Sequence, residues 1–256
     1  MKLQILGTSA CEFSPRLNTD LKDKFDKDAR RSSSAIVDDR FLLDCGIYTP
    51  ESLGIASIST NGITDIFLTH LHRDHYIKEN VELVAKEHST PVRLWVREDA
   101  EINVEGVTIM RMTPYTTYEV ADGVCVTGLP ANHDPRAYPQ HILLEVEGQK
   151  LYYGIDGAWM LHDSFKFLKN KKLDIAVLDC TSGDYNGDFR MGEHNSIPMI
   201  RLMLPSLKTI GAIDEHTKII LTHLAPSLHK SHAETEIIAN KFGATVAYDG
   251  RTVYTD

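Results

Sequence analysis

Apolar residues occur along the chain in short runs of strand length, separated by Gly, Pro, Asn and charged positions. Strands are predicted at residues 2–6, 34–44, 64–69, 92–96, 107–112, 123–129, 141–146, 150–155, 174–179, 218–222 and 245–248. The turn at residues 147–149 separates two of these runs and is typical of a hairpin. β-Strands therefore dominate the expected secondary structure.

Helical segments lie between the strands, and each ends near Gly, Pro or Asn. They are predicted at residues 77–87, 158–169, 195–208 and 232–241. The strands come in runs that helices interrupt, whereas strands and helices alternate one to one in a doubly wound parallel sheet. The pattern predicts an α/β protein in which two sheets lie between outer helices.

The charged segment at residues 14–31 contains few large apolar side chains. A solvated loop is the simpler interpretation. The alternative is a flap beside a functional site, because loops often carry such roles.

Length and composition place the chain among ordinary globular proteins. The 256 residues are enough for a substantial core, and we expect a single domain over residues 1–256. Hydrophobic residues make up 42% and charged residues 25%, which argues against a disordered or fibrous chain. The net charge of -9 argues against a long nucleic acid as partner, because such a partner requires clustered Lys and Arg.

Cysteine use and the lack of targeting segments both favour the cytoplasm. Cys11, Cys45, Cys125 and Cys180 form no CxxC pair and are expected to be reduced thiols. The first residues lack the apolar core of a signal peptide, and no apolar run reaches the roughly 18 residues that a membrane span needs. We expect no membrane partner, and a homodimer is left open.

The densest group of chemical side chains is the segment THLHRDH at residues 69–75, between an apolar strand and a predicted helix. Three imidazoles and a carboxylate on one strand-to-helix turn can address a common point, and both groups are good ligands for divalent metals. The candidate ligands in this segment are His70, His72, Asp74 and His75.

Three more candidate ligands each follow an apolar run. His133, Asp156 and His223 lie at the carboxyl ends of predicted strands, where a site built along one edge of packed sheets would collect them. Together with the HxHxDH segment they supply two sets of three donors and one carboxylate able to bridge. That donor set suits two divalent ions about 3.5–4 Å apart, with Zn, Mn or Fe compatible.

On these residues the chain resembles the metallo-β-lactamase superfamily, from Leu6-Gly7-Thr8 to Thr222-His223. The resemblance implies an αββα sandwich with two central mixed sheets. It also implies that one metal is held by His70, His72 and His133, the other by Asp74, His75 and His223, and that Asp156 bridges the two.

Weaker motifs make the chain similar to the phosphodiesterase branch, which includes tRNA 3′-processing endonucleases and the cyclic phosphodiesterase of phosphonate breakdown. These motifs are LGTSA, the segment at residues 31–34, DCT at residues 179–181 and GEHN at residues 192–195. Two departures stand out. Only Cys11 precedes the early charged segment, so no structural metal is expected there, and no insertion resembles a Gly-rich, basic tRNA-binding arm.

The resemblance assigns catalytic roles to three residues. Asp74 would orient the attacking water in addition to binding metal. His194 would donate a proton to the leaving oxygen, and Asp179 would hold the His194 ring as an imidazolium by charge pairing. The alternative interpretation of this pair is structural, with His194 capping a helix and Asp179 forming a turn.

The sequence therefore predicts a metal-dependent hydrolase, with a small or cyclic phosphodiester as the substrate. Two alternatives are kept: hydrolysis of a lactone, thioester or β-lactam at the same site, and a non-catalytic, metal-binding accessory protein of cofactor biosynthesis. Polar loop residues that could contact substrate are Tyr138, Tyr185, Asn186 and Arg190. His229 and His232 could reach the rim of the pocket, while His141 and the other histidines are expected to be surface or hydrogen-bonding residues.

Overall fold

The computed structural model describes residues 1–86 and 88–255. Its first sheet is mixed: the first three pairings in the order below are antiparallel and the last three are parallel. The strand order is β14 (Thr252–Tyr254), β1 (Lys2–Gly7), β2 (Ser34–Val37), β3 (Phe41–Leu43), β4 (Asp65–Phe67), β5 (Val92–Arg97) and β6 (Val107–Met112).

The second sheet repeats this mixture of directions, with parallel pairing at one edge and antiparallel pairing at the other. Its order is β13 (Ala244–Val246), β12 (Lys218–Thr222), β11 (Ile175–Asp179), β10 (Gln149–Gly154), β9 (Gln140–Val146), β8 (Val124–Pro130) and β7 (Thr117–Ala121). Each sheet has seven strands, so the predicted fold class is confirmed.

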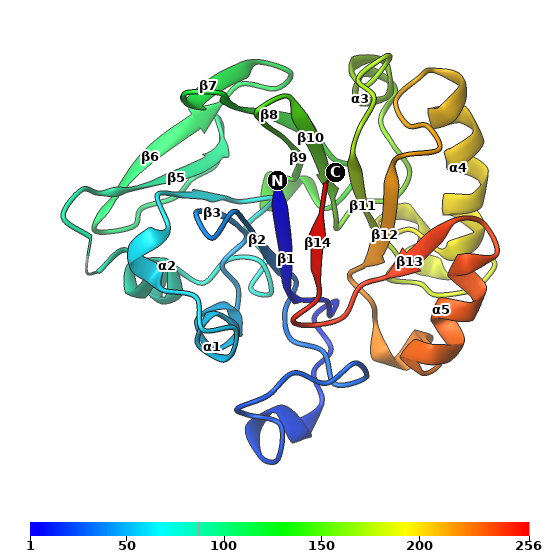
Figure 1. Ribbon diagram of the computed structural model, residues 1–256, viewed down its shortest axis with the longest axis horizontal. Coiled ribbons are helices and arrows are strands. Elements are labelled where there is room, and N and C mark those ends of the chain that lie inside the picture. Colours follow the sequence, from blue (N-terminus) through cyan, green and yellow to red (C-terminus); the bar gives the residue numbers. More distant parts are fainter. Residues whose placement is uncertain (87, 256) are drawn as a thin grey trace.

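Helices cover the outer face of each sheet (Figure 1). The first sheet packs its outer apolar side chains against α1 (Thr49–Ile55) and α2 (Lys78–Ala85). The second is covered by α3 (His162–Phe167), α4 (Ile197–Thr209) and α5 (His232–Asn240). Short 3-10 helices complete the chain: η1 (Pro15–Asn18), η2 (Thr60–Gly62), η3 (Pro135–Ala137), η4 (Phe189–Gly192) and η5 (Pro226–Leu228).

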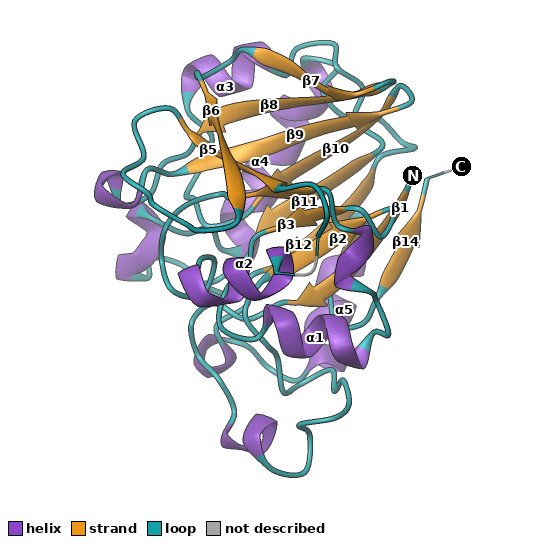
Figure 2. Cartoon of the chain, turned by 90° about the vertical axis from the view of Figure 1, so that its left-hand side faces the viewer, coloured by secondary structure: helices purple, strands orange, loops and turns teal. Residues whose placement is uncertain are grey.

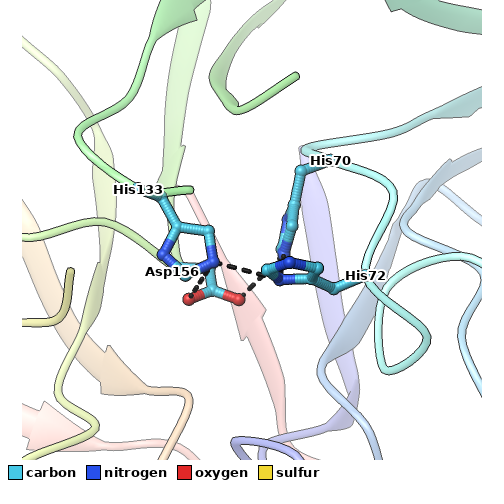
Figure 3. Close-up of side chains that lie close together, drawn as sticks. All are labelled: His70, His72, His133 and Asp156. Carbon is cyan, nitrogen blue, oxygen red and sulfur yellow. Dashed lines mark hydrogen bonds and ion pairs between the residues drawn. The ribbon is translucent and has the colours of Figure 1, made fainter. Parts of the chain in front are cut away.

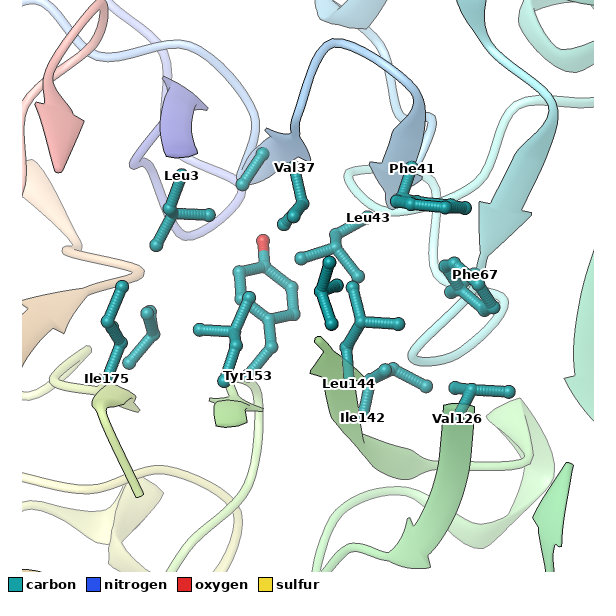
Figure 4. Packing of buried hydrophobic residues seen from close by; sticks show 14 of the residues in the cluster. Leu3, Val37, Phe41, Leu43, Phe67, Val126, Ile142, Leu144, Tyr153 and Ile175 are labelled. Carbon is teal, nitrogen blue, oxygen red and sulfur yellow. The ribbon is translucent and has the colours of Figure 1, made fainter. Parts of the chain in front are cut away.

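The main core fills the space between the two sheets (Figure 4). Alternate residues of each strand point inward, as the two-residue period of a strand requires. Val37 and Phe67 from the first sheet thus meet Ile142, Leu144 and Tyr153 from the second. Apolar residues on the opposite faces pack under the helices, which gives four layers.

Several predicted boundaries were wrong for local reasons. The apolar run at residues 34–44 is two strands, because Asp38 (φ 51°) and Asp39 (φ 53°) turn the backbone into the left-handed region. The helix predicted at residues 158–169 is confined to α3, because Trp159 has φ 52° and donates its N–H to Asn195 Oδ1 at 2.8 Å.

The helix predicted at residues 77–87 corresponds to α2, and Glu87 lies outside the described residues. β7, β14 and α1 were not predicted. β7 and β14 are short edge strands with exposed or half-exposed residues, and α1 begins with proline in its first turn and contains Gly54.

The segment predicted as a charged loop projects beyond the sandwich (Figure 1, Figure 2). It is not simply solvated, because Leu17, Leu21 and Ala29 are buried in a small apolar cluster of their own. Arg31, the last residue of the segment, is fully buried and donates to the Leu21 carbonyl at 2.7 Å.

The four cysteines are free thiols, as predicted. Within residues 1–86 and 88–255, the structure contains no helix with the length and apolar character needed to cross a membrane.

Candidate metal centre

Strand ends from both sheets converge at one edge of the sandwich and carry every ligand predicted from the sequence. The HxHxDH segment follows β4 in the first sheet. In the second sheet His133 follows β8, Asp156 follows β10 and His223 follows β12. Both sheets therefore contribute side chains to one cluster.

One half of the cluster consists of His70, His72, His133 and Asp156, whose donor atoms all lie within 4.8 Å of one another (Figure 3). His72 Nδ1 is 3.1 Å from both His70 Nε2 and His133 Nε2. Asp156 Oδ2 is 3.0 Å from His70 Nε2, and Asp156 Oδ1 is 3.5 Å from His133 Nε2.

The other half consists of Asp74, His75, Asp156 and His223, all of which are buried. His75 Nε2 and His223 Nε2 are 3.1 Å apart. Asp156 Oδ2 is 3.2 Å from the first of these nitrogens and 3.4 Å from the second. Asp156 thus contributes donor atoms to both halves.

The donor set fits divalent metals. Ligand atoms 2.0–2.2 Å from a tetrahedral ion lie roughly 3.3–3.6 Å from one another, close to the separations found here. Imidazole nitrogens facing each other at 3.1 Å repel unless a cation or a proton lies between their lone pairs. Buried Asp156 faces imidazole nitrogens of both halves, with its Oδ2 3.0 Å from His70 Nε2 and 3.2 Å from His75 Nε2, as a shared ligand requires.

His194 and Asp179, the predicted acid and its partner, also meet at this edge. His194 Nδ1 lies 3.3 Å from Asp179 Oδ2 and 3.0 Å from Asp156 Oδ1. Burial lowers the pKa of His194, but its hydrogen bonds to Asp156 and Asp179 outweigh that effect and raise the pKa to about 11. The geometry therefore favours a protonated His194 ring.

Hydrogen-bond partners behind the ligands include one residue that the sequence analysis missed. Asp44 is fully buried after β3, and its Oδ2 is 2.8 Å from His75 Nδ1. Its one sequence signal is its position, an acidic residue directly after an apolar strand, which it shares with Asp156.

A cavity of about 470 Å³ adjoins the cluster, and the predicted ligands that line it are His72, Asp74, His133, Asp156 and His223, together with His194. Residues lining it that were not predicted are Ala10, Cys11, Glu12, Arg73, Thr181, Glu193 and Ala225. Arg190, one of the four predicted contact residues, also lines it. Tyr185 and His229 instead line a separate cavity of about 330 Å³.

The remaining histidines considered in the sequence analysis have structural contacts. His232 Nδ1 is 3.3 Å from Arg30 Nη2, away from the cluster. His141 is buried, and its Nδ1 pairs with the Tyr152 hydroxyl at 2.6 Å. Burial lowers the pKa of His141 to about 4, so the ring is neutral at physiological pH.

Sequence comparison gives a partial match. The family model described as "Anti-Pycsar protein Apyc1" matches residues 24–101, a stretch that contains the HxHxDH segment. No curated protein matches the chain.

Solved structures match nearly the whole chain. Human tRNase Z, short form, has a TM-score of 0.70 and 17% identity, with 100% of each chain covered. A diphosphatase of the PhnP family has a TM-score of 0.73 and 18% identity, covering 100% of this chain and 98% of its own. The metallo-β-lactamase fold protein YhfI from Bacillus subtilis has a TM-score of 0.72 and 13% identity, with 98% of each chain covered. The chain therefore has the metallo-β-lactamase fold, and the predicted resemblance is confirmed at the level of the fold.

Proposed function

We propose that this protein of the metallo-β-lactamase fold is a metal-dependent phosphodiesterase that uses two divalent ions to hydrolyse a small or cyclic, nucleotide-like phosphodiester. The observation that carries the proposal is His194, held by Asp179 beside the shared ligand Asp156. Hydrolysis of an alkyl phosphodiester needs a proton donor for the departing alkoxide, and His194 is placed beside the centre to be that donor.

The chain's own residues would bind the two ions and orient the attacking water. His70, His72 and His133 would hold one ion, Asp74, His75 and His223 the other, with Asp156 shared. Two ions bound there supply an activated water and neutralise charge on the phosphoryl oxygens. Asp74 would also orient the attacking water.

The cavity fits the proposed substrate in size, and two arginines are among its lining residues. A volume of about 470 Å³ lies in the range of small-molecule sites. Arg73 and Arg190 line this cavity and would attract a phosphate, although the chain as a whole carries a charge of -9. The overall charge disfavours a long polyanion, so the proposal is a small ligand.

Two of the similar structures are named for action on phosphate linkages, a tRNase and a diphosphatase. These names support the choice of reaction class. Substrate size and the role of His194 rest on the site itself.

The test compares three substrate classes with protein loaded separately with Zn and Mn: phosphodiesters, a lactone and a nitrocefin-type β-lactam. Phosphodiesters would be bis(p-nitrophenyl) phosphate and nucleoside cyclic phosphates. We expect turnover of the phosphodiesters only. Cleavage of a carbonyl substrate alone would indicate a hydrolase of lactones, thioesters or β-lactams. No turnover of any of the three substrate classes, with metals bound, would favour an accessory protein of cofactor biosynthesis.

The His194→Ala variant tests the proton donor. We expect a loss of about 10²–10⁴-fold in turnover of a cyclic nucleotide, the usual contribution of a placed acid. Turnover of bis(p-nitrophenyl) phosphate should fall much less, because p-nitrophenolate departs without a proton. His216→Ala is the matched control, since His216 is exposed and precedes β12 at the end opposite His223. Equal losses on both substrates would contradict the assignment.

A further inference from the structure

Two groups of residues behind the centre share an arrangement of one aspartate, one threonine and two histidines. In the first group, Asp44 follows β3 and Thr69 follows β4. Asp44 Oδ1 accepts the Thr69 backbone N–H at 2.7 Å, and the Thr69 hydroxyl donates to the same carboxylate at 2.9 Å. Both residues are fully buried.

The second group repeats these contacts with residues from the other sheet. Asp179 ends β11, and its Oδ1 accepts the Thr181 N–H at 3.2 Å. The Thr181 hydroxyl donates to Asp179 Oδ2 at 2.9 Å. Asp179 is fully buried and Thr181 nearly so, which leaves little room for water to replace either group.

A hydroxyl has a single proton, so each threonine that donates to its aspartate can only accept from a neighbouring imidazole. The Thr69 hydroxyl lies 3.1 Å from His70 Nδ1, and the Thr181 hydroxyl lies 2.7 Å from His223 Nδ1. The Thr181 hydroxyl also lies 2.9 Å from the His223 carbonyl. If it donates its proton to that carbonyl, it again has none for His223 Nδ1 and can only accept from that nitrogen.

The aspartates act on the histidines in the same sense. Asp44 Oδ2 faces His75 Nδ1 at 2.8 Å, and Asp179 Oδ2 faces His223 Nδ1 at 3.1 Å. An ionised carboxylate can only accept, so the facing Nδ1 atoms must carry protons. A neutral imidazole protonated at Nδ1 has its lone pair on Nε2, the atom that His70, His75 and His223 turn toward Asp156.

We propose that Thr69 and Thr181 are positioning residues that fix the Nδ1–H tautomer and the ring orientation of the histidines in the metal centre. The two threonines support different parts of the centre. Thr69 contacts His70 of one half and orients Asp44, which holds His75 of the other half, so it supports both ion sites. Thr181 contacts His223 and also His194 at 3.2 Å, so it supports one ion site and the proton donor.

This inference rests on the metal-binding part of the proposed function, but its test needs no substrate. Thr69→Val and Thr181→Val remove the hydroxyl while keeping the shape of the side chain, and zinc affinity is measured by competition with a chromophoric chelator. Loss of a hydrogen-bond partner behind a metal ligand typically weakens affinity 10–100-fold. We expect that loss at both sites for Thr69→Val and at one site for Thr181→Val.

Two controls separate positioning from general damage to the fold. Thr69→Ser and Thr181→Ser retain the hydroxyl and should restore zinc affinity. Thr217→Val removes a buried hydroxyl that donates to the Leu173 carbonyl at 2.7 Å, at the opposite end of β12, and should leave zinc affinity unchanged. Valine variants with wild-type affinity, or serine variants that fail to restore it, would overturn the proposal.

A measurement on the unaltered chain covers the case in which the valine variants fail to fold. Long-range 1H–15N spectra of zinc-loaded protein labelled at histidine should show protonated Nδ1 atoms for His70, His75 and His223. Protonated Nε2 in any of them would refute the proposal. A chain that binds two ions in this way but hydrolyses no phosphodiester would refute the proposed function and leave this inference intact.

Discussion

Asp249 is a buried carboxyl group shortly before β14, and its burial makes a contribution to stability that depends on pH. It accepts hydrogen bonds from the Thr8 hydroxyl at 2.8 Å and the Arg31 N–H at 2.7 Å. Burial outweighs these contacts and raises its pKa from 3.8 to about 7.

Between about pH 4 and 7 the folded chain therefore keeps a proton that the unfolded chain releases. Stability falls as pH rises through this window and levels off above it, by about 1.4 kcal/mol for each unit of pKa shift. The comparison is urea unfolding of the wild type and Asp249→Asn from pH 5 to 8.5. We expect the variant to lack this part of the slope, and the exposed control Asp122→Asn to keep it. Parallel profiles for wild type and Asp249→Asn would contradict the raised pKa.

At the same scale, the sequence predicted those site residues whose chemistry is concentrated in a motif. HxHxDH places four donors in six positions, and the remaining ligands follow strongly apolar strands. Asp44 could not be found in this way, because an acidic residue after a strand is usually a turn former. Only the fold shows that Asp44 lies beneath His75.

At the scale of elements, the β3 end and the HxHxDH segment are in direct backbone contact. Cys45 N–H donates to the His75 carbonyl at 2.8 Å. A Cβ added to Gly46 would lie 1.8 Å from the Asp74 carbonyl oxygen, a backbone atom that cannot yield without moving the metal-binding segment.

Gly46→Ala should therefore displace this segment. We expect a loss of roughly 1–3 kcal/mol in unfolding free energy, as for other overpacked sites, together with at least about a tenfold loss in zinc affinity. Gly54→Ala is the matched control. A Cβ there meets nothing within 4 Å, and the change should stabilise α1 by roughly 0.5–1 kcal/mol. Urea unfolding and chelator competition give both quantities, and an unchanged zinc affinity in Gly46→Ala would count against this contact.

Element types were predictable where apolar periodicity was strong, and boundaries were not. The run at residues 34–44 contains no Gly or Pro, and the turn is marked only by the charged residues Asp38, Asp39 and Arg40, a signal that the prediction overlooked. β7 and β14 escaped prediction because each is short and has a single buried residue, so neither forms an apolar run.

At the scale of the whole molecule, the predicted ligands come from both layers, whose main contact is the apolar core between the sheets. Strand order could not be predicted, because pairings such as Leu3 with Val253 connect distant parts of the chain. The sequence did predict that the candidate ligands meet at one edge of the sheets, because each of them follows an apolar run of strand length.

Removal of metal should therefore lower the stability of the whole fold. Ions present at 1,000 times their dissociation constant would stabilise the folded chain by about 4 kcal/mol each. For a chain of this size we expect dialysis against a chelator to lower Tm by on the order of 10 °C, and zinc to restore it. Differential scanning calorimetry with and without metal measures the change, and a Tm independent of metal would contradict a bound ion at this centre.

The pairing of β14 with β1 has a consequence for the order in which the protein is made. β1 leaves the ribosome long before its outer partner, Thr252–Tyr254. Until then β1 presents an open edge to other nascent chains, and exposed edges of this kind promote aggregation. His223 likewise emerges long after the HxHxDH segment. Folding during synthesis must therefore wait for nearly the whole chain, which makes this protein a candidate client of chaperones that shield unpaired strands.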